Sequence, residues 1–173
     1  MRVLFIALLL LIGCAPQEIK DTSIKMTEMK QLVVTSVFEH NTAIPKKYAC
    51  DGENINPPLH IEGIPEKTQS LVLIVDDPDA PVGIWDHWIV WNIPPTSAIA
   101  EDSVPGVEGL NSWEKKPYGG PCPPSGTHRY FFKVYAVDTM LDLGANAVKS
   151  DVEKAMKSHI LAQGELIGLY SRK

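Results

Sequence analysis

The sequence predicts a mainly β domain in which two sheets pack together, with one or two helices late in the chain. Residues 32–38, 70–75 and 87–93 are runs of β-branched and aromatic side chains that end at turn residues, as strands do. Residues 128–138 carry bulky apolar groups on both faces, which is typical of a central strand covered on each side. The β-α-β-α rhythm of a Rossmann sheet is missing, and so are G-x-G-x-x-G and P-loop motifs. We therefore expect no nucleotide or other cofactor.

Length and composition narrow the class of protein further. A length of 173 residues is typical of one domain. The chain has 21 acidic and 16 basic side chains, which gives a net charge of -5. Because no basic stripe is present, we expect no binding to nucleic acid. Three cysteines without C-x-x-C or H-x-x-x-H spacing predict no structural metal site.

One helix is signalled near the C-terminus. Ser150 and Glu153 have the spacing of a capping box, which predicts a helix that starts at Ser150 and ends before Gly164. Its apolar face would consist of Val152, Ala155, Met156, His159 and Ile160. Residues 165–170 then read as a short final strand.

The first residues have the pattern of an export signal. Met1 and Arg2 precede ten apolar residues, 3–12, about half of what a bilayer-spanning helix needs. Leu11-Ile12-Gly13-Cys14 resembles the lipobox of bacterial lipoproteins, which implies cleavage before Cys14 and a lipid on its sulfur. The alternatives are a plain cleaved signal or a short buried helix.

The lipobox resemblance sets the expected organisation of the chain. Residues 1–13 would be a lipoprotein signal peptide, 14–31 a lipidated tether and 32–173 the folded domain. Ala15 after the cysteine resembles lipoproteins that are sent on to the outer membrane. We expect an exported protein anchored to a membrane through Cys14, at the periplasmic face of the outer membrane if the host is Gram-negative.

A cluster of carboxylates follows the second predicted strand. Asp76, Asp77 and Asp79 occupy three of four positions, next to Pro78 and Pro81. Like charges at this spacing repel, so the cluster costs stability unless hydrogen-bond donors or a cation satisfy it. Ordinary turn chemistry is the alternative, since Asp beside Pro favours turns.

Three segments together resemble the phosphatidylethanolamine-binding protein family, also called Raf kinase inhibitor-like proteins, in its bacterial and archaeal branch. They are D-P-D-A-P at 77–81, H-W-x-V-x-N-I-P at 87–94 and P-P-x-G-x-H-R-Y at 123–130, and residues 50–54 and 57–59 also match. The resemblance covers roughly residues 32–172. It implies a β-sandwich of this family's type with one or two peripheral helices and a small anion-binding pocket at one end.

The resemblance also implies which residues line the pocket. They are Asp77, Asp79, His87, Pro124, Gly126 and His128, to which the alternation of the strand adds Tyr130 on the same face as His128. Eukaryotic members carry a C-terminal helix with a tyrosine near the pocket, whereas this chain ends soon after its final strand. Tyr170 is therefore not assigned that role.

The proposed site is chemically coherent. A nearby carboxylate favours the imidazolium form of a histidine, which can donate hydrogen bonds to a phosphate oxygen. Asp77 and Asp79 could keep His87 and His128 charged and could also meet an ammonium group. Such a pocket suits a monoanion or a zwitterion better than a dianion.

The other polar side chains are given structural roles. Arg129 faces away from His128 and is expected to pair with an acid near the rim of the pocket. His40, His60 and His159 are read as structural, and His159 as part of the helix's apolar face. A packed, structural role also remains open for His87 and His128.

Three functional classes remain open. The first is a non-catalytic binding or regulatory protein for a small anion such as phosphate or a phospholipid headgroup, with no catalytic residue. The second is an inhibitor of a hydrolase or another protein partner. The third is a weak hydrolase that uses Cys122 as nucleophile together with His128. Once Cys14 carries lipid, Cys50 and Cys122 remain as an even pair that forms either a disulfide or two free thiols.

Overall fold

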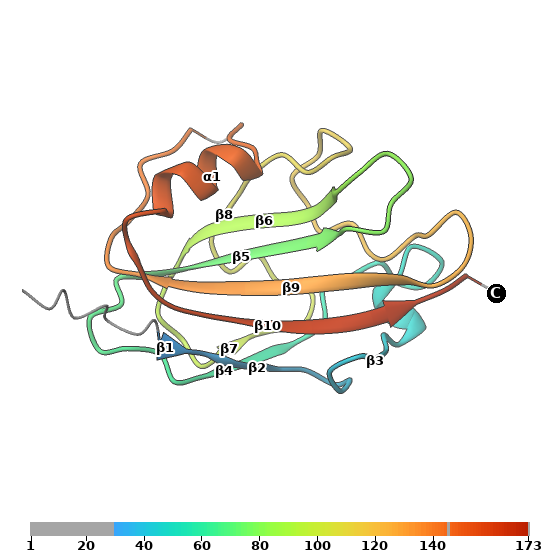
Figure 1. Cartoon of the computed structure of the whole chain (residues 1–173), viewed down its shortest axis with the longest axis horizontal. Coiled ribbons are helices and arrows are strands. Elements are labelled where there is room, and N and C mark those ends of the chain that lie inside the picture. The colour runs from blue at the N-terminus through green and yellow to red at the C-terminus, as the bar shows by residue number, and fades with distance from the viewer. Residues whose placement is uncertain (1–29, 145, 173) are drawn as a thin grey trace, which may run out of the picture.

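The computed structural model describes residues 30–144 and 146–172, and these form two sheets with one α-helix between the last two strands (Figure 1). The large sheet has the order β1 (Lys30–Gln31), β10 (Ile160–Tyr170), β9 (His128–Val137), β5 (Ser70–Asp77), β6 (Trp85–Ile93) and β8 (Val107–Glu108), with β3 (Thr42–Ala43) also paired to β10. The small sheet has the order β2 (Val33–Thr35), β4 (Leu59–Glu62) and β7 (Ala98–Ile99). The two helical elements are the 3-10 turn η1 (Lys46–Tyr48) and the helix α1 (Lys149–Met156). The expected mainly β fold with two sheets is confirmed.

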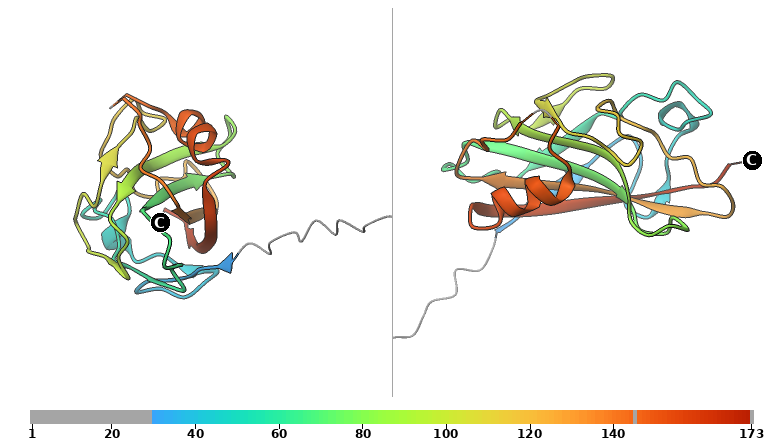
Figure 2. Two further views of the ribbon diagram at one scale, coloured as in Figure 1. Left: turned by 90° about the vertical axis from the view of Figure 1, so that its left-hand side faces the viewer. Right: turned by 90° about the horizontal axis from the view of Figure 1, so that it is seen from above.

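The large sheet is covered on both faces, and β5 lies in its middle. Leu71, Leu73 and Val75 face the small sheet, while Val72 and Ile74 face the side covered by α1. All eight residues of β5 are buried. Figure 2 shows α1 on the side of the large sheet that faces away from the small one. The continuous apolar run in the sequence is explained by this double burial.

The strand β9 is central, as predicted, but it is covered fully on one face only. Tyr130, Phe132 and Val134 are buried between the sheets. On the outer face, Phe131 and Lys133 are half-buried. The prediction of a strand covered on both sides was therefore wrong for this strand and describes β5.

The helix α1 begins and ends earlier than the sequence suggested. The Asp151 carboxylate accepts a hydrogen bond from the Val148 backbone N–H, so the N-cap lies at Val148, two residues before the expected Ser150. The helix stops at Met156 and Gly164 lies within β10. Pairing of β10 with β9 begins at Ile160 and overrides the helical periodicity of residues 157–163.

Several smaller features also differ from the expectation or complete the description of the fold. The first predicted strand is reduced to β2, and pairing in the large sheet already begins at Lys30, two residues before the expected start of the domain. His159 lies outside the helix, where its Nδ1 contacts Asp138 Oδ1 at 2.8 Å, and does not pack on an apolar face. His40 and His60 are exposed. Within the described ranges, no helix is long and apolar enough to span a membrane.

The two ends of the sandwich carry different parts of the chain. β1 joins β10 near its start, where Lys30 pairs with Ala162. His128 pairs with Tyr170 at the far end of the same strand, eight residues further on (162 to 170). At about 3.3 Å per residue this is roughly 26 Å, so the N-terminal segment joins the fold at the end opposite His128 (Figure 1).

Candidate functional site

The structure brings His128 and Asp77 together at the end of the large sheet. His128 is the first residue of β9 and Asp77 the last of β5, and both side chains point between the sheets. His128 Nδ1 lies 2.8 Å from Asp77 Oδ2, and the two residues are only 7% and 3% exposed. Asp77 Oδ1 accepts a second hydrogen bond, from the Asp79 backbone N–H at 2.8 Å. Asp77 thus fixes the orientation of the His128 ring and leaves its Nε2 for a ligand.

The three clustered carboxylates do not share a site, because they take different partners. Asp76 faces the α1 side, where its oxygens accept hydrogen bonds from Lys133 Nζ at 2.8 Å and Lys149 Nζ at 2.6 Å. Asp77, one residue later, faces the opposite side of the strand. The repulsion expected from the sequence is therefore relieved by separate donors.

Asp79 is occupied by the predicted basic partner. Arg129 donates to its carboxylate through Nε at 2.9 Å and Nη2 at 2.7 Å, and through its backbone N–H at 3.0 Å. The Arg129 guanidinium lowers the pKa of Asp79 to about 2. The prediction for Arg129 was correct, whereas Asp79 does not stand free to meet an ammonium group and acts on the site by holding the loop 78–84 against β9.

His87 is a buried histidine that packs against aromatic rings. It is 2% exposed, its Nδ1–H donates to the Gly119 carbonyl at 2.6 Å, and its ring meets those of Trp113 and Tyr130 edge-on at 5.0 and 5.2 Å. Burial lowers the pKa of His87, and the bond to Gly119 opposes this only in part. This burial disfavours the imidazolium expected of His87, since desolvation penalises the charged form.

Tyr130 places an unused donor beside these histidines. The residue is completely buried, and its hydroxyl lies near the Asp77 carboxylate and the Cys122 backbone without making a hydrogen bond of good geometry to any described residue. Burial raises the pKa of the phenol, so the hydroxyl keeps its proton. A buried hydroxyl without a partner is uncommon in folded proteins and calls for an explanation such as a ligand.

The loop 124–127, directly before His128, adds backbone donors. Pro124 and Gly126 lie on this exposed loop. Gly126 has a positive φ of 69°, and no atom of the described residues lies within 4 Å of where its Cβ would be. No described residue accepts a hydrogen bond from the backbone N–H of Ser125, Gly126 or Thr127. Such a run of free N–H groups can contact an anion.

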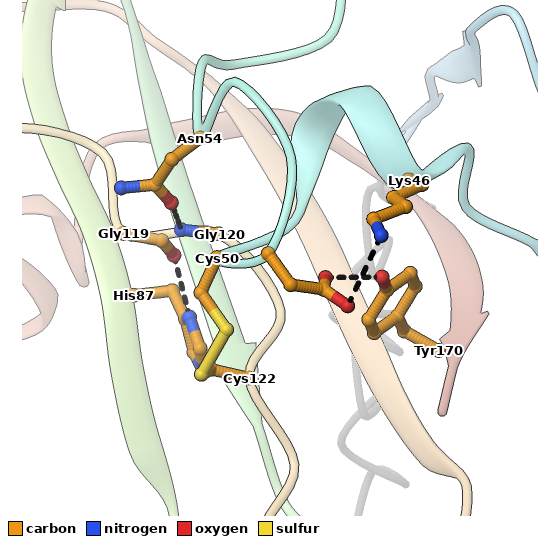
Figure 3. Close-up of a disulfide and its surroundings, with 9 residues drawn as sticks. Lys46, Cys50, Asn54, His87, Gly119, Gly120, Cys122 and Tyr170 are labelled. Atoms are coloured by element: carbon orange, nitrogen blue, oxygen red, sulfur yellow. Dashed lines mark hydrogen bonds and ion pairs between the residues drawn. A yellow bond between two sulfur atoms is a disulfide. The ribbon is translucent and has the colours of Figure 1, made fainter. Parts of the chain in front are cut away.

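A disulfide joins Cys122, two residues before this loop, to Cys50 in the segment that follows β3 (Figure 3). The two sulfur atoms are bonded at an S–S distance of 2.06 Å. Of the two alternatives for this cysteine pair, a disulfide or two free thiols, the structure contains the disulfide. The Cys50 backbone N–H donates to the Pro121 carbonyl at 3.1 Å, and the Gly120 N–H donates to Asn54 Oδ1 at 2.8 Å. Because its sulfur is bonded, Cys122 does not offer the thiolate that the hydrolase alternative requires.

No feature of the sequence predicts that Tyr170 lies beside His128. The two residues pair directly across β10 and β9. The Tyr170 hydroxyl donates to Asp51, and burial together with this bond raises the pKa of Tyr170 to about 12. A cavity of about 460 Å³ lies between Tyr170 and Thr127, with Ile44 and Leu169 in its wall. Only the strand register reveals this neighbourhood.

The described residues contain no group of three or more His, Cys, Asp or Glu side chains placed to hold a metal ion. The site therefore consists of one oriented histidine, one free phenol and a backbone loop beside a carboxylate.

A model of the phosphatidylethanolamine-binding protein family matches residues 34–171. The chain belongs to this family.

Relatives and solved structures agree with the family assignment. A UPF0098 protein of Methanothermobacter thermautotrophicus is 51% identical over 146 residues, which cover 80% of this chain and 97% of the relative. A phosphatidylethanolamine-binding protein homologue from Chlamydia trachomatis has a TM-score of 0.80 and 41% identity, over 83% of this chain and 99% of the other. E. coli YBCL, described as a member of the mammalian family, has a TM-score of 0.76 and 30% identity over the same shares.

Proposed function

We propose that this family member is a non-catalytic binding protein for a small anion such as phosphate or a phospholipid headgroup. The ligand would lie at His128, Tyr130 and the loop 124–127. The observation that carries the proposal is the buried Tyr130 hydroxyl, which has no partner among the described residues and lies on the same face as a histidine held by Asp77. An anion oxygen would accept its hydrogen bond.

The charge of the site favours a particular kind of anion. The imidazolium form of His128 and the loop N–H groups offer donors, but the Asp77 carboxylate lies 2.8 Å from the other ring nitrogen of the histidine. A dianion would be repelled by this carboxylate more strongly than a monoanion. Phosphoethanolamine would place its phosphate on the donors, and its ammonium group, which offsets one phosphate charge, toward the carboxylate side. We therefore name phosphoethanolamine as the test ligand.

Tyr130→Phe separates a binding role from a structural one. We expect it to weaken phosphoethanolamine binding about tenfold, because a hydrogen bond to a charged ligand is lost. The free energy of unfolding should change little, since the hydroxyl makes no hydrogen bond of good geometry to the described residues. Calorimetric titration and urea denaturation measure the two quantities.

Tyr135→Phe is the matched control, because Tyr135 lies on the outer face of the same strand. It should leave the affinity unchanged. If Tyr130→Phe binds like the wild type, or if it is clearly less stable than the wild type, the hydroxyl is not the ligand donor.

We also propose that the protein is an exported lipoprotein, anchored to a membrane through Cys14, after removal of residues 1–13. These residues and the tether up to residue 29 lie outside the described part of the chain, so the proposal is supported by the Leu11-Ile12-Gly13-Cys14 motif alone. The tether would enter the fold at β1, at the end opposite His128. A relaxed tether of about 16 residues reaches roughly 20–25 Å, so it would favour orientations in which the site faces away from its own membrane.

Cys14→Ser tests the anchor. In the bacterial host the wild-type protein should partition into detergent, and its N-terminal peptide should carry the mass of acyl chains. The variant should remain in the aqueous phase because it has no thiol to acylate. Equal partitioning of the two proteins, with no acyl mass on the wild type, would refute the lipoprotein assignment.

A further inference from the structure

A second cavity lies beside the disulfide, apart from the anion site. It has a volume of about 330 Å³, near the lower limit for small-molecule pockets. Its walls are the rings of Trp113, Pro117 and Tyr118 and the disulfide of Cys50 and Cys122. Asp77, His128 and Tyr130 are not among its lining residues. The cavity therefore offers an apolar, largely aromatic surface that the proposed anion site does not use.

The walls of this cavity are held rigidly by buried polar contacts. Asn111 is 5% exposed and uses its whole side chain: its Oδ1 accepts from the backbone N–H groups of Trp113 and Lys115, and its Nδ2 donates to the His87 and Pro117 carbonyls. The Tyr118 ring meets Trp88 edge-on, and its hydroxyl donates to the Tyr48 carbonyl. A pocket with walls fixed in advance loses little entropy when a ligand binds.

The backbone around the cavity allows its wall segments to pack closely together. A Cβ on Gly119 would come within 2.5 Å of the Trp113 ring, and one on Gly120 within 2.3 Å of the Tyr48 carbonyl oxygen. Asn54, in the wall, and Glu114, between two wall residues, have positive φ angles of 59° and 58°. Non-glycine residues adopt this conformation rarely, and such residues cluster at functional sites.

The only charged side chain among the lining residues is the basic Lys115. Lys115 contributes an ammonium group from an exposed position whose backbone is fixed by Asn111. Asn54 uses its oxygen for Gly120, which leaves its Nδ2 free to donate (Figure 3). No Asp or Glu lines the cavity. Apolar rings beside a cation and an amide donor are complementary to an apolar ring that carries one carboxylate.

We propose that this cavity is a second binding site, for a small aromatic monocarboxylic acid. The ring of the ligand packs against Trp113, Tyr118 and the disulfide, and its carboxylate meets the Lys115 ammonium and the Asn54 amide. The site is independent of the proposed anion site, so either proposal can fail while the other holds.

The test uses N-acetylphenylalanine as the acid and N-acetylphenylalanine amide as its neutral counterpart, with calorimetric titration of the purified protein. The wild type should bind the acid about fivefold more tightly than the amide, which corresponds to one exposed ion pair. Lys115→Ala should remove this difference, and the neighbouring Lys116→Ala, a matched control outside the lining, should keep it. Trp113→Ala should weaken both ligands at least tenfold, and Trp113→Phe should retain most of the affinity.

His128→Ala decides whether the two sites are distinct, because it should leave N-acetylphenylalanine binding unchanged while phosphoethanolamine binding falls. Simultaneous loss of both ligands in His128→Ala would place the acid in the anion site and overturn the second site. Equal affinity for the acid and the amide, equal effects of the two lysine variants, or no binding of the acid at millimolar concentration would also overturn it. Much tighter binding of a peptide that ends in phenylalanine would assign the cavity to a protein C-terminus instead of a small acid.

Discussion

Replacing His128 with Ala is expected to lower the affinity for phosphoethanolamine ten- to a hundredfold. The reason is that His128, in its imidazolium form, donates from Nε2 to the anion, and one hydrogen bond to a charged group contributes about 1.5–3 kcal/mol. Asp77 holds the ring at 2.8 Å, so the donor is in place before the ligand arrives. Calorimetric titration of the folded variant measures the change.

His40→Ala is the control for this experiment, since His40 is exposed and its Nδ1 contacts the Ile167 backbone N–H, not a residue of the proposed site. It should bind like the wild type. A second comparison uses Asp77→Asn, which keeps an acceptor oxygen for His128 but removes the negative charge that supports the imidazolium and could meet an ammonium group. It should weaken phosphoethanolamine more than inorganic phosphate, because only the former carries an ammonium group. Unchanged binding in folded His128→Ala would place the ligand elsewhere.

Removal of the disulfide is expected to cost about 4 kcal/mol of stability. Cys50 and Cys122 close a chain segment with a sequence separation of 72 residues. In the chain-entropy model, opening a loop of about 70 residues costs roughly 4 kcal/mol, because the unfolded chain gains that freedom. The double variant Cys50→Ser/Cys122→Ser should therefore unfold at clearly lower urea concentration than the wild type under non-reducing conditions.

Reduction of the wild type with a thiol reagent provides an independent version of the same change and should reproduce the stability of the double variant. The variant should also bind phosphoethanolamine less tightly, since the loop 124–127 loses its attachment to the segment that follows β3. Two titratable thiols at Cys50 and Cys122 in unfolded, non-reduced protein would contradict the disulfide. A variant as stable as the wild type would contradict its role.

Strand alternation explains why much of the site could be predicted from the sequence. His128 and Tyr130 have the same parity in β9 and both are buried between the sheets, while Arg129 between them faces outward. The expectation that Arg129 pairs with an acid near the rim followed from this parity, and Asp79 is that acid. The face of a strand on which a residue lies depends only on its position along that strand, so it can be predicted without knowing the rest of the fold.

Other features depend on contacts between distant segments and could not be predicted. The lowered pKa of His87 follows from its enclosure by Trp113, Tyr130 and Gly119, which only the folded chain brings together. The position of Tyr170 beside His128 follows from the register of β10. The early end of α1 has the same origin, because strand pairing in β10 outweighs a helical pattern that is convincing in isolation.

The sequence motif does not predict whether the Tyr130 hydroxyl is available to a ligand. The residue belongs to the P-P-x-G-x-H-R-Y pattern, and its parity places it beside His128, but neither observation tells whether its hydroxyl is already bonded. The structure shows a buried hydroxyl without a partner among the described residues. This is the property that makes Tyr130 a candidate ligand donor, because a satisfied hydroxyl would have no bond to offer.

The most direct test of the anion site is a nuclear magnetic resonance titration that follows the ring nitrogens of the histidines while phosphoethanolamine is added. We predict that the His128 ring signals and the backbone amide signals of Gly126 and Thr127 shift along one saturable curve, with the midpoint found by calorimetry, while His40 does not move. Saturable binding by calorimetry without any shift at His128, Gly126 or Thr127 would contradict the proposed site.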